Sequence, residues 1–297
     1  MIGLGRDLGR VLVTGGQGFL GAALVRRLLV LGHDVIATDL TSDSHGCDLT
    51  DFAAVEALVR RRFQTIFHCG AVSGPMVLSD RPLAIWQINA LGTAHVLEAA
   101  RLHGTERIVV CSTSDVYGPR IRNVDELSLP EPQSVYAASK LAAEVATLGY
   151  VREHGLDAVA LRLSWIYGPG RLTPTMLETV LRAVIAGQDA VFDAPPGDMT
   201  HYLYIDDAVN GLLAAAHAAA LPERVYNISA GDGVLVHKLA DILMRIQPQA
   251  RIGFCMDGLS GGGPTAIDNR RAVAQLGFQP AITAEEGLEF YLRALRV

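Results

Sequence analysis

The sequence predicts an α/β fold of the doubly wound type, with a parallel sheet covered by helices on both faces. Short, nearly uninterrupted apolar runs alternate with longer segments of helical periodicity, and a glycine-rich turn follows the first apolar run. The chain has 297 residues, half of them hydrophobic, which is enough for a large core. A smaller, mixed α/β region at the C-terminal end is expected to form a lid over the carboxyl ends of the strands, where such folds bind ligands.

The first half of the chain contains the expected sheet. Its strands are predicted over Val11–Val13, Val35–Thr38, Thr65–Phe67, Ile108–Cys111 and Ala158–Leu163. The intervening helices are predicted over Phe19–Leu31, Asp51–Phe63, Leu83–His103 and Val135–Glu153. Gly32 and Gly104 follow two of these helices, as expected for residues that end a helix.

The regular alternation stops after Gly170. Short strands are expected over Ala190–Phe192, Tyr202–Ile205 and Val225–Ile228. Helices are expected over Pro174–Ala186, from the predicted N-cap Asp206 to Ala220, over Leu235–Ile246, and from the capping box Thr283–Glu286 to about Leu295.

Composition excludes several classes of function. A net charge of −6 provides no electrostatic reason to bind nucleic acid or an anionic membrane. No apolar stretch approaches the roughly 18 residues of a membrane helix, and the first ten residues lack the apolar core of a signal peptide. The four isolated cysteines and the dispersed histidines favour a cytoplasmic protein with reduced thiols and no metal site.

The glycine-rich turn indicates a dinucleotide site. Gly15, Gly18 and Gly21 follow the first strand and open the first helix, and Gly16 also fits the G-x-G-x-x-G spacing. Glycine lets the backbone approach a pyrophosphate without a Cβ atom in the way, and the helix N-terminus provides unpaired N–H groups.

An acidic residue at the end of the second strand indicates which dinucleotide binds. Asp39 lies 24 residues after Gly15, where a carboxylate accepts hydrogen bonds from ribose hydroxyls and repels a 2′-phosphate, which favours NAD over NADP. The alternative is an ordinary solvated aspartate. Asp48 and Leu49 are placed either to meet the adenine or simply to start the next helix.

A tyrosine and a lysine one helical turn apart form the candidate catalytic pair. Tyr136 and Lys140 share a helix face, and a nearby ammonium group is expected to lower the pKa of the phenol so that it exchanges a proton with a substrate hydroxyl. The chain has only two lysines, Lys140 and Lys238, against 25 − 2 = 23 arginines. A compact ammonium that tunes a phenol is not easily replaced by a guanidinium. The alternative is a surface pair without function.

Hydroxyl groups end the fourth strand. Ser112 and Thr113 are placed to orient a substrate alcohol beside Tyr136. The alternative is a strand-end turn in which these hydroxyls bond to their own backbone.

These motifs resemble those of the extended short-chain dehydrogenases/reductases, in the NAD-dependent epimerase/dehydratase branch. Further blocks in that family's order are His68–Ala71, Asn89–Thr93, Leu97–Ala100, Leu161–Arg162, Tyr167–Gly170, Tyr204–Asp207, Tyr226–Ile228 and Leu276–Pro280. The resemblance implies a Rossmann domain over residues 1–168, with 202–229 returning to it, and a substrate-binding domain over 169–201 and 230–297. It also implies a homodimer formed through the two long helices Leu83–His103 and Val135–Glu153.

The resemblance also assigns roles to individual residues. Thr113, Tyr136 and Lys140 would be catalytic. The cofactor-binding residues implied are Gly15, Gly18, Phe19, Leu20, Gly21, Asp39, Leu40, Asp48, Leu49, Cys69, Gly70, Ala71, Asn89, Ser112, Tyr136 and Lys140. The substrate-binding residues implied are Ser73, Ser114, Trp165, Arg171, His201 and Arg270.

Three departures from the family pattern concern the substrate. Ser114–Asp115 stands where sugar-nucleotide dehydratases have Asp-Glu, which makes dehydration improbable. Trp165 replaces an asparagine that meets the diphosphate in nucleotide-sugar epimerases, and Thr200–Tyr202 replaces an Arg-Asp-Phe whose arginine pairs with phosphate. Arg171 and Arg270 or Arg271 are the candidates to compensate.

The leading interpretation is therefore an NAD-dependent oxidoreductase or epimerase that acts on a secondary alcohol of a sugar or sugar derivative, including a sugar nucleotide. One alternative is a dehydrogenase of small sugar acids or polyhydroxy acids that releases NADH. A second is a non-catalytic NAD-binding regulator, although such proteins typically lose the tyrosine or the lysine.

Overall fold

A six-stranded parallel sheet forms the centre of the computed structural model, which describes residues 5–41, 45–119, 123–256 and 264–296. Its strand order is β10-β5-β4-β3-β1-β2. The strands are β1 (Val11–Thr14), β2 (Val35–Thr38), β3 (Thr65–His68), β4 (Arg107–Thr113), β5 (Ala158–Leu163) and β10 (Val225–Ile228). All six were predicted from the sequence. β10, from the second half of the chain, pairs in parallel with β5.

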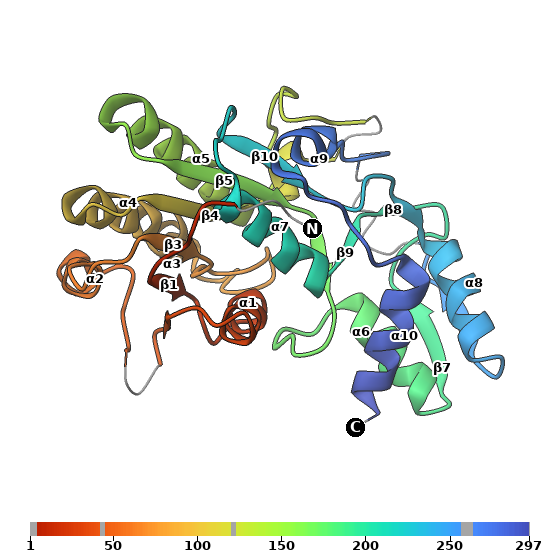
Figure 1. Cartoon of the computed structure of the whole chain (residues 1–297). Coiled ribbons are helices and arrows are strands. Elements are labelled where there is room, and N and C mark those ends of the chain that lie inside the picture. Colours follow the sequence, from red (N-terminus) through yellow and green to blue (C-terminus); the bar gives the residue numbers. More distant parts are fainter. Residues whose placement is uncertain (1–4, 42–44, 120–122, 257–263, 297) are drawn as a thin grey trace.

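The apolar strand sequences follow from burial on both faces. Val13 packs with Leu24 of α1 (Phe19–Val30) and Leu212 of α7 (Ile205–His217), whereas its neighbour Leu12 packs on the opposite face with Val55 and Val96. Figure 1 shows α1 and α7 on one side of the sheet and the other helices on the opposite side. Those helices are α2 (Phe52–Val59), α4 (Gly92–His103) and α5 (Val135–His154).

The strand order creates a binding crevice. β1 and β3 are neighbours in the sheet. The connection from β1 leads to β2 on one side, and the connection from β3 leads to β4 on the other, so the two run outwards in opposite directions. The turns that follow β1 and β3 therefore border a crevice at the carboxyl edge of the sheet, where ligands of doubly wound folds bind.

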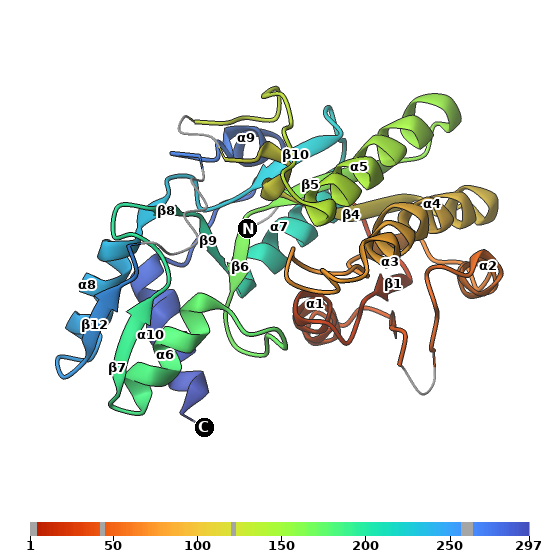
Figure 2. The same ribbon diagram turned by 180° about the vertical axis from the view of Figure 1, so that it is seen from behind.

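A second hydrophobic cluster lies beside the sheet. It is built by α6 (Met176–Ile185), α8 (Val236–Ile246), α10 (Ala284–Leu295) and the parallel strand pair β7 (Asp189–Phe192) and β12 (Arg251–Phe254). Figures 1 and 2 show these elements gathered at one end of the molecule, with the C-terminus among them. Two short strand pairs lie towards the sheet: β6 (Trp165–Tyr167) with β9 (Tyr202–Tyr204), and β8 (Met199–Thr200) with β11 (Val234–Leu235).

The predicted helix Leu83–His103 is interrupted. It consists of α3 (Pro82–Trp86), a π-helical turn over Gln87–Leu91, and α4. Thr93, near the start of α4, donates its hydroxyl back to the carbonyl oxygen of Asn89 in the turn at 2.6 Å. A π-bulge has no periodicity signal of its own, and such turns are frequent at functional sites.

Other boundaries also differ from the sequence-based predictions. Tyr204, not Asp206, is the N-cap of α7, and the helix ends at His217 rather than Ala220. α2 ends at Val59 rather than Phe63, and Arg62 has a positive φ of 61° just beyond it. The strands β6, β8, β11 and β12 and the helix α9 (Arg270–Leu276) were not predicted, because elements of two to seven residues have little periodicity.

None of the helices in the described part of the chain has the length and apolar character needed to cross a membrane.

Candidate active site

The turn between β1 and α1 needs glycine for steric reasons. Gly15 has φ +66°, and a Cβ atom there would lie 2.6 Å from the backbone nitrogen of Gly70, in the turn after β3. A Cβ atom on Gly21 would lie 2.0 Å from the carbonyl oxygen of Gly15. The turn is thus packed onto the end of β3 and onto the first turn of α1, and both contacts are between backbone atoms.

The N-terminus of α1 is open to an anion. Gly18 is its N-cap, no side chain caps it, and its first turn contains no acidic residue. A helix start of this kind has unpaired N–H groups and the positive end of the helix dipole. The residues present therefore fit the pyrophosphate of a dinucleotide.

Asp39 lies beside this turn. Its carboxylate accepts hydrogen bonds from the backbone N–H groups of Gln17 at 3.1 Å and Leu40 at 2.8 Å. This position, next to the glycines and partly open to solvent, fits a ribose. Asp48 instead accepts from the N–H and the hydroxyl of Thr50, at 2.9 and 2.7 Å, which matches the helix-entry alternative.

The helix α5 brings the candidate catalytic residues to the carboxyl edge of the sheet. Ser134 is its N-cap, and its hydroxyl accepts from Ala137 N at 3.1 Å. Thr113, the last residue of β4, lies within hydrogen-bonding reach of the Tyr136 phenol. Lys140 is 4% exposed, and no carboxylate of the described residues pairs with it. Lys238 is 60% exposed and pairs with Asp241, so the two lysines have very different surroundings.

The pKa shifts differ from the sequence-based expectation. Burial raises the pKa of Tyr136, and the negative charge of Asp115 raises it further, whereas the hydrogen bond with Thr113 lowers it. Burial also lowers the pKa of Lys140. The expectation that Lys140 holds the phenol pKa below its usual value is therefore wrong for the protein alone: burial raises this pKa most, and the cation that lowers it is Arg171.

Two residues assigned to the cofactor have other partners. Asn89 is fully buried, and its amide bonds to the backbone of Val72 and donates to the Ser139 hydroxyl at 3.0 Å. Ser139 in turn donates to the carbonyl oxygen of Tyr136 at 2.7 Å. Ser112 donates to Glu144, one turn beyond Lys140, at 3.1 Å. Asn89 and Ser112 thus hold the catalytic helix in place.

A buried histidine connects the glycine-rich turn with the same network. His68 lies between the hydroxyls of Thr14 and Thr93, at 2.8 and 3.0 Å. Burial lowers its pKa to about 3, so the ring is neutral. The Thr93 hydroxyl already donates to the Asn89 carbonyl, so the His68 Nε2–H donates to Thr93 and Nδ1 accepts from Thr14. The sequence signalled His68 only as part of a family block.

A cavity of about 350 Å³ opens beside Tyr136. Three of the predicted substrate residues, Ser114, Trp165 and His201, line it. Its other described lining residues were not predicted as a set: Asp115, Gly118, Pro119, Gln133, Ser134, Ala137, Met199, Pro264 and Ile267. The lining as a whole comes from five separate segments, and nothing in the sequence indicates that these segments meet.

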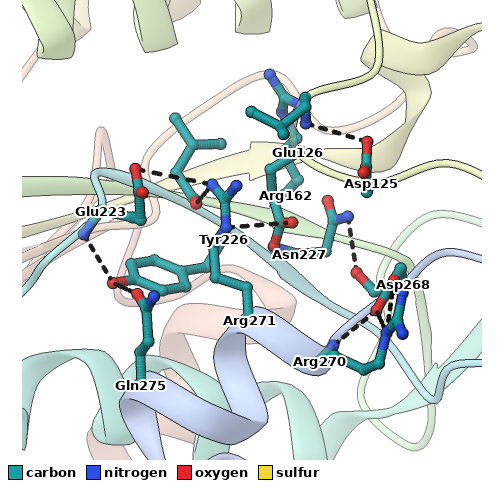
Figure 3. Close-up of polar contacts among 12 residues, drawn as sticks. Asp125, Glu126, Arg162, Glu223, Tyr226, Asn227, Asp268, Arg270, Arg271 and Gln275 are labelled. Carbon is teal, nitrogen blue, oxygen red and sulfur yellow. Dashed lines mark hydrogen bonds and ion pairs between the residues drawn. The ribbon is translucent and has the colours of Figure 1, made fainter.

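The remaining predicted substrate residues lie outside this lining. Ser73 is exposed. Arg171 donates to the Ile166 carbonyl at 3.0 Å, and its guanidinium lies 5.6 Å from the centre of the Phe19 ring. Arg270 is 89% exposed and pairs with Asp268, as Figure 3 shows. Arg271 forms an ion pair with Glu126 at 3.5 Å and donates a hydrogen bond to the Val225 carbonyl oxygen at 3.2 Å.

Comparison with known proteins agrees with this architecture. The family model described as "NAD dependent epimerase/dehydratase family" matches residues 11–229. A dTDP-glucose 4,6-dehydratase of Streptomyces griseus is 29% identical over 94% of this chain and 91% of its own length. The structure of a UDP-glucose 4-epimerase of Thermotoga maritima, determined with UDP-glucose, has a TM-score of 0.88 and 25% identity over 97% of this chain and 98% of that one.

A further solved structure contains the cofactor. It is that of MoeE5 in complex with UDP-glucuronic acid and NAD, with a TM-score of 0.86 and 28% identity over 97% of this chain and 99% of that one. The crevice after β1 and β3, the open start of α1 and the buried Lys140 are consistent with NAD as the cofactor of this chain. The chain therefore belongs to the NAD-dependent epimerase/dehydratase family.

Proposed function

We propose that the protein catalyses reversible hydride transfer between NAD and a secondary alcohol of a nucleotide-linked sugar, and that it works as an epimerase. The main support is the convergence of Thr113, Tyr136 and Lys140 at the carboxyl edge of the sheet, next to the cavity. The epimerase and dehydratase among the relatives support a sugar nucleotide as the substrate class.

In this mechanism, Tyr136 exchanges a proton with the substrate hydroxyl while Thr113 orients that hydroxyl. NAD, when bound, supplies the hydride acceptor and a positive charge on its nicotinamide ring. Lys140 would donate hydrogen bonds to the ribose hydroxyls of the cofactor, and its ammonium would oppose the rise in the Tyr136 pKa that burial causes. Gly15, Gly18 and Gly21 would hold the pyrophosphate, and Asp39 would accept hydrogen bonds from the adenosine ribose.

Dehydration is disfavoured by the residue after Thr113. Elimination of water needs an acid that protonates the departing hydroxyl, and Ser114 offers only an aliphatic hydroxyl at that position. An epimerase keeps its NAD and returns the hydride to the same carbon, whereas a dehydrogenase releases NADH.

The test is a turnover assay with tightly bound NAD measured in parallel. We expect purified protein to retain NAD, to convert a nucleotide sugar to its epimer, and to leave no net NADH. Tyr136→Phe should reduce kcat by about 100-fold to 10,000-fold and retain NAD binding, because general acid–base catalysis typically contributes that factor. Accumulating NADH would identify a dehydrogenase instead, and unchanged turnover in Tyr136→Phe would exclude the mechanism.

We also propose a homodimer formed through α4 and α5. Large apolar side chains on the outer surfaces of these helices and of the turn before α4 are exposed: Leu91 and Leu102 at 48% each and Val145 at 60%. Apolar surface of this kind is typical of interaction sites. A mass by light scattering of twice 31.7 kDa would support the dimer, and a monomer at micromolar concentration would exclude it.

We propose the cytoplasm as its compartment. All four cysteines are free, and the Cys69 and Cys111 sulfur atoms lie 3.6 Å apart without a disulfide. A reducing compartment keeps such thiols intact. Cell fractionation that placed the protein elsewhere would contradict this assignment.

A further inference from the structure

Two cysteines lie side by side at the carboxyl edge of the sheet, and the proposed mechanism gives neither of them a role. The Sγ atoms of Cys69 and Cys111 are 3.6 Å apart, within hydrogen-bonding distance for sulfur. Both side chains belong to the hydrophobic cluster on the face of the sheet that α1 and α7 cover. Cys111 is within β4, and Cys69 directly follows β3, where His68 pairs with Val110. The two cysteines are therefore at the same level on neighbouring strands.

The surroundings of this pair favour a reactive thiolate. The hydrogen bond with Cys69 lowers the pKa of the Cys111 thiol, burial raises it, and the positive charge of Lys140 lowers it further. A thiolate is the form of cysteine that attacks an oxidant, and a neighbouring lysine is typical of reactive cysteines. Cys111 is buried, whereas Cys69 is partly exposed, so a small oxidant can reach the pair from the Cys69 side.

Closure of the pair into a disulfide would move Cys69 more than Cys111. A disulfide has an S–S length of about 2.0 Å, so the two sulfur atoms must approach each other by about 1.6 Å. Cys111 is held from both sides, because β4 pairs with β3 and with β5. Cys69 lies one residue beyond the end of β3, so the movement falls mainly on Cys69 and on Gly70 after it.

Cys69 and Gly70 support the glycine-rich turn. The Cys69 N–H donates to the Thr14 carbonyl oxygen at 3.2 Å, and the Gly70 N–H donates to the Thr14 hydroxyl at 3.1 Å. Gly15 packs so closely here that a Cβ atom on it would lie 2.8 Å from the Cys69 carbonyl carbon. A shift of Cys69 therefore displaces the turn whose backbone fits the pyrophosphate of NAD.

We propose that Cys69 and Cys111 form a redox switch, which closes into a disulfide on exposure to a hydroperoxide and thereby weakens NAD binding. This inference goes beyond the proposed function, since it concerns cofactor binding and applies equally to an epimerase and to a dehydrogenase.

The oxidation has two steps. The Cys111 thiolate attacks an oxygen of hydrogen peroxide, so that an S–O bond forms, the O–O bond breaks and water leaves, and Cys111 becomes a sulfenic acid. The Cys69 sulfur then attacks the Cys111 sulfur, so that the S–S bond forms, the S–O bond breaks and the hydroxyl group leaves as water with the thiol proton. In total, two thiols and one hydrogen peroxide give one disulfide and two waters.

The coupling between oxidation and NAD binding acts in both directions. If the disulfide raises the dissociation constant of NAD tenfold, saturating NAD makes the disulfide tenfold less favourable. For this two-electron couple, a factor of ten corresponds to a rise of about 30 mV in the reduction potential of the pair. NAD therefore protects the pair against oxidation.

The test measures the disulfide and the NAD affinity on the same wild-type protein, before and after treatment with hydrogen peroxide. We expect the intact mass to fall by the mass of two hydrogen atoms, and a peptide map to join Cys69 to Cys111. The dissociation constant of NAD, from a fluorescence titration, should rise at least tenfold, and dithiothreitol should restore it. Saturating NAD during the treatment should slow the formation of the disulfide.

Cys111→Ala removes one partner of the pair, so peroxide should leave its NAD affinity unchanged. Cys255→Ala is the matched control, because it also removes one free thiol, directly after β12, and it should respond to peroxide as the wild-type protein does. Melting curves establish that both variants are folded, and the peptide map and the reversal by dithiothreitol need no variant.

Three results would overturn the inference: a peptide map without the Cys69–Cys111 link, a disulfide that leaves the NAD affinity unchanged, or an equal loss of affinity in folded Cys111→Ala. Each of them leaves the proposed function standing, because turnover is not part of the measurement. Failure of the reduced protein to bind NAD would overturn the proposed function as well.

Discussion

The cofactor crevice and the substrate cavity are built in opposite ways. The crevice is made mainly of backbone: Gly15 packs on Gly70 and Gly21 packs on Gly15, and the buried Lys140 lies near Cys69, the residue after β3. The cavity is made of side chains from five segments, and its charged group is the carboxylate of Asp115. A site made of backbone contacts tolerates little change, whereas a lining of side chains can alter its substrate without disturbing the sheet.

The largest expected effect concerns α5, the helix that contributes residues to both the cofactor crevice and the substrate cavity. Glu144 lies on the same face of α5 as Tyr136 and Lys140, and it forms a fully buried ion pair with Arg162 while accepting from Ser112. Glu144→Gln leaves the Arg162 charge uncompensated in the core. We expect the free energy of unfolding to fall by about 3 kcal/mol, measured by urea denaturation.

The control for this change lies on α8, away from the sheet. The pair between Lys238 and Asp241 on α8 is exposed, so Asp241→Asn should change stability by less than about 0.5 kcal/mol. A loss below about 1 kcal/mol for Glu144→Gln would show that this ion pair does not anchor the catalytic helix.

The next effect tests how rigid the crevice is. In Gly21→Ala, the new methyl group would lie 2.0 Å from the Gly15 carbonyl oxygen, so the glycine-rich turn must move. We expect the dissociation constant of NAD to rise by about 100-fold, equivalent to about 3 kcal/mol, in a fluorescence titration. Gly149→Ala in α5 is the control, because nothing lies within 4 Å of its new methyl group, and NAD binding should be unchanged. Unaltered NAD affinity in Gly21→Ala would refute the rigid-crevice description.

The same contrast explains which parts could be predicted from the sequence. Four of the six strands are apolar runs buried on both faces, and the edge strands β2 and β10 are less completely buried. Each was found because burial favours an apolar run of this length. Gly15, Thr113, Tyr136 and Lys140 follow strand ends or share a helix turn, so local spacing already brings them to the crevice.

The cavity could not be predicted in the same way. His201 and Ser134 meet across it because of a chain path that spans two-residue strands and loops, which have no periodicity. The hydrogen bonds that Asn89 and Ser112 make to α5 could not be predicted either, since a family block shows a residue type but not its partners within the protein. Asp115 was noted only as a departure from the dehydratase pattern, although its charge is the main feature of the cavity.

The smallest expected effect tests whether the carboxylates of Asp39 and Asp115 act on different ligands. Asp39 is partly open to solvent and accepts from the N–H groups of Gln17 and Leu40, while Asp115 faces the cavity. Asp39→Ser should weaken NAD binding by roughly tenfold, because a hydrogen bond to a charged group contributes about 1.5 kcal/mol or more, and should improve NADP binding as the repulsion of its 2′-phosphate is removed. Paired titrations with NAD and NADP measure both changes, with Asp34→Asn, at the other end of β2, as the control. The affinity for a nucleotide sugar, measured on the NAD-saturated protein, should stay as in the wild-type protein. A change in that affinity would mean that the two sites share their electrostatic field, and the division between a cofactor crevice and a separate substrate cavity would fail.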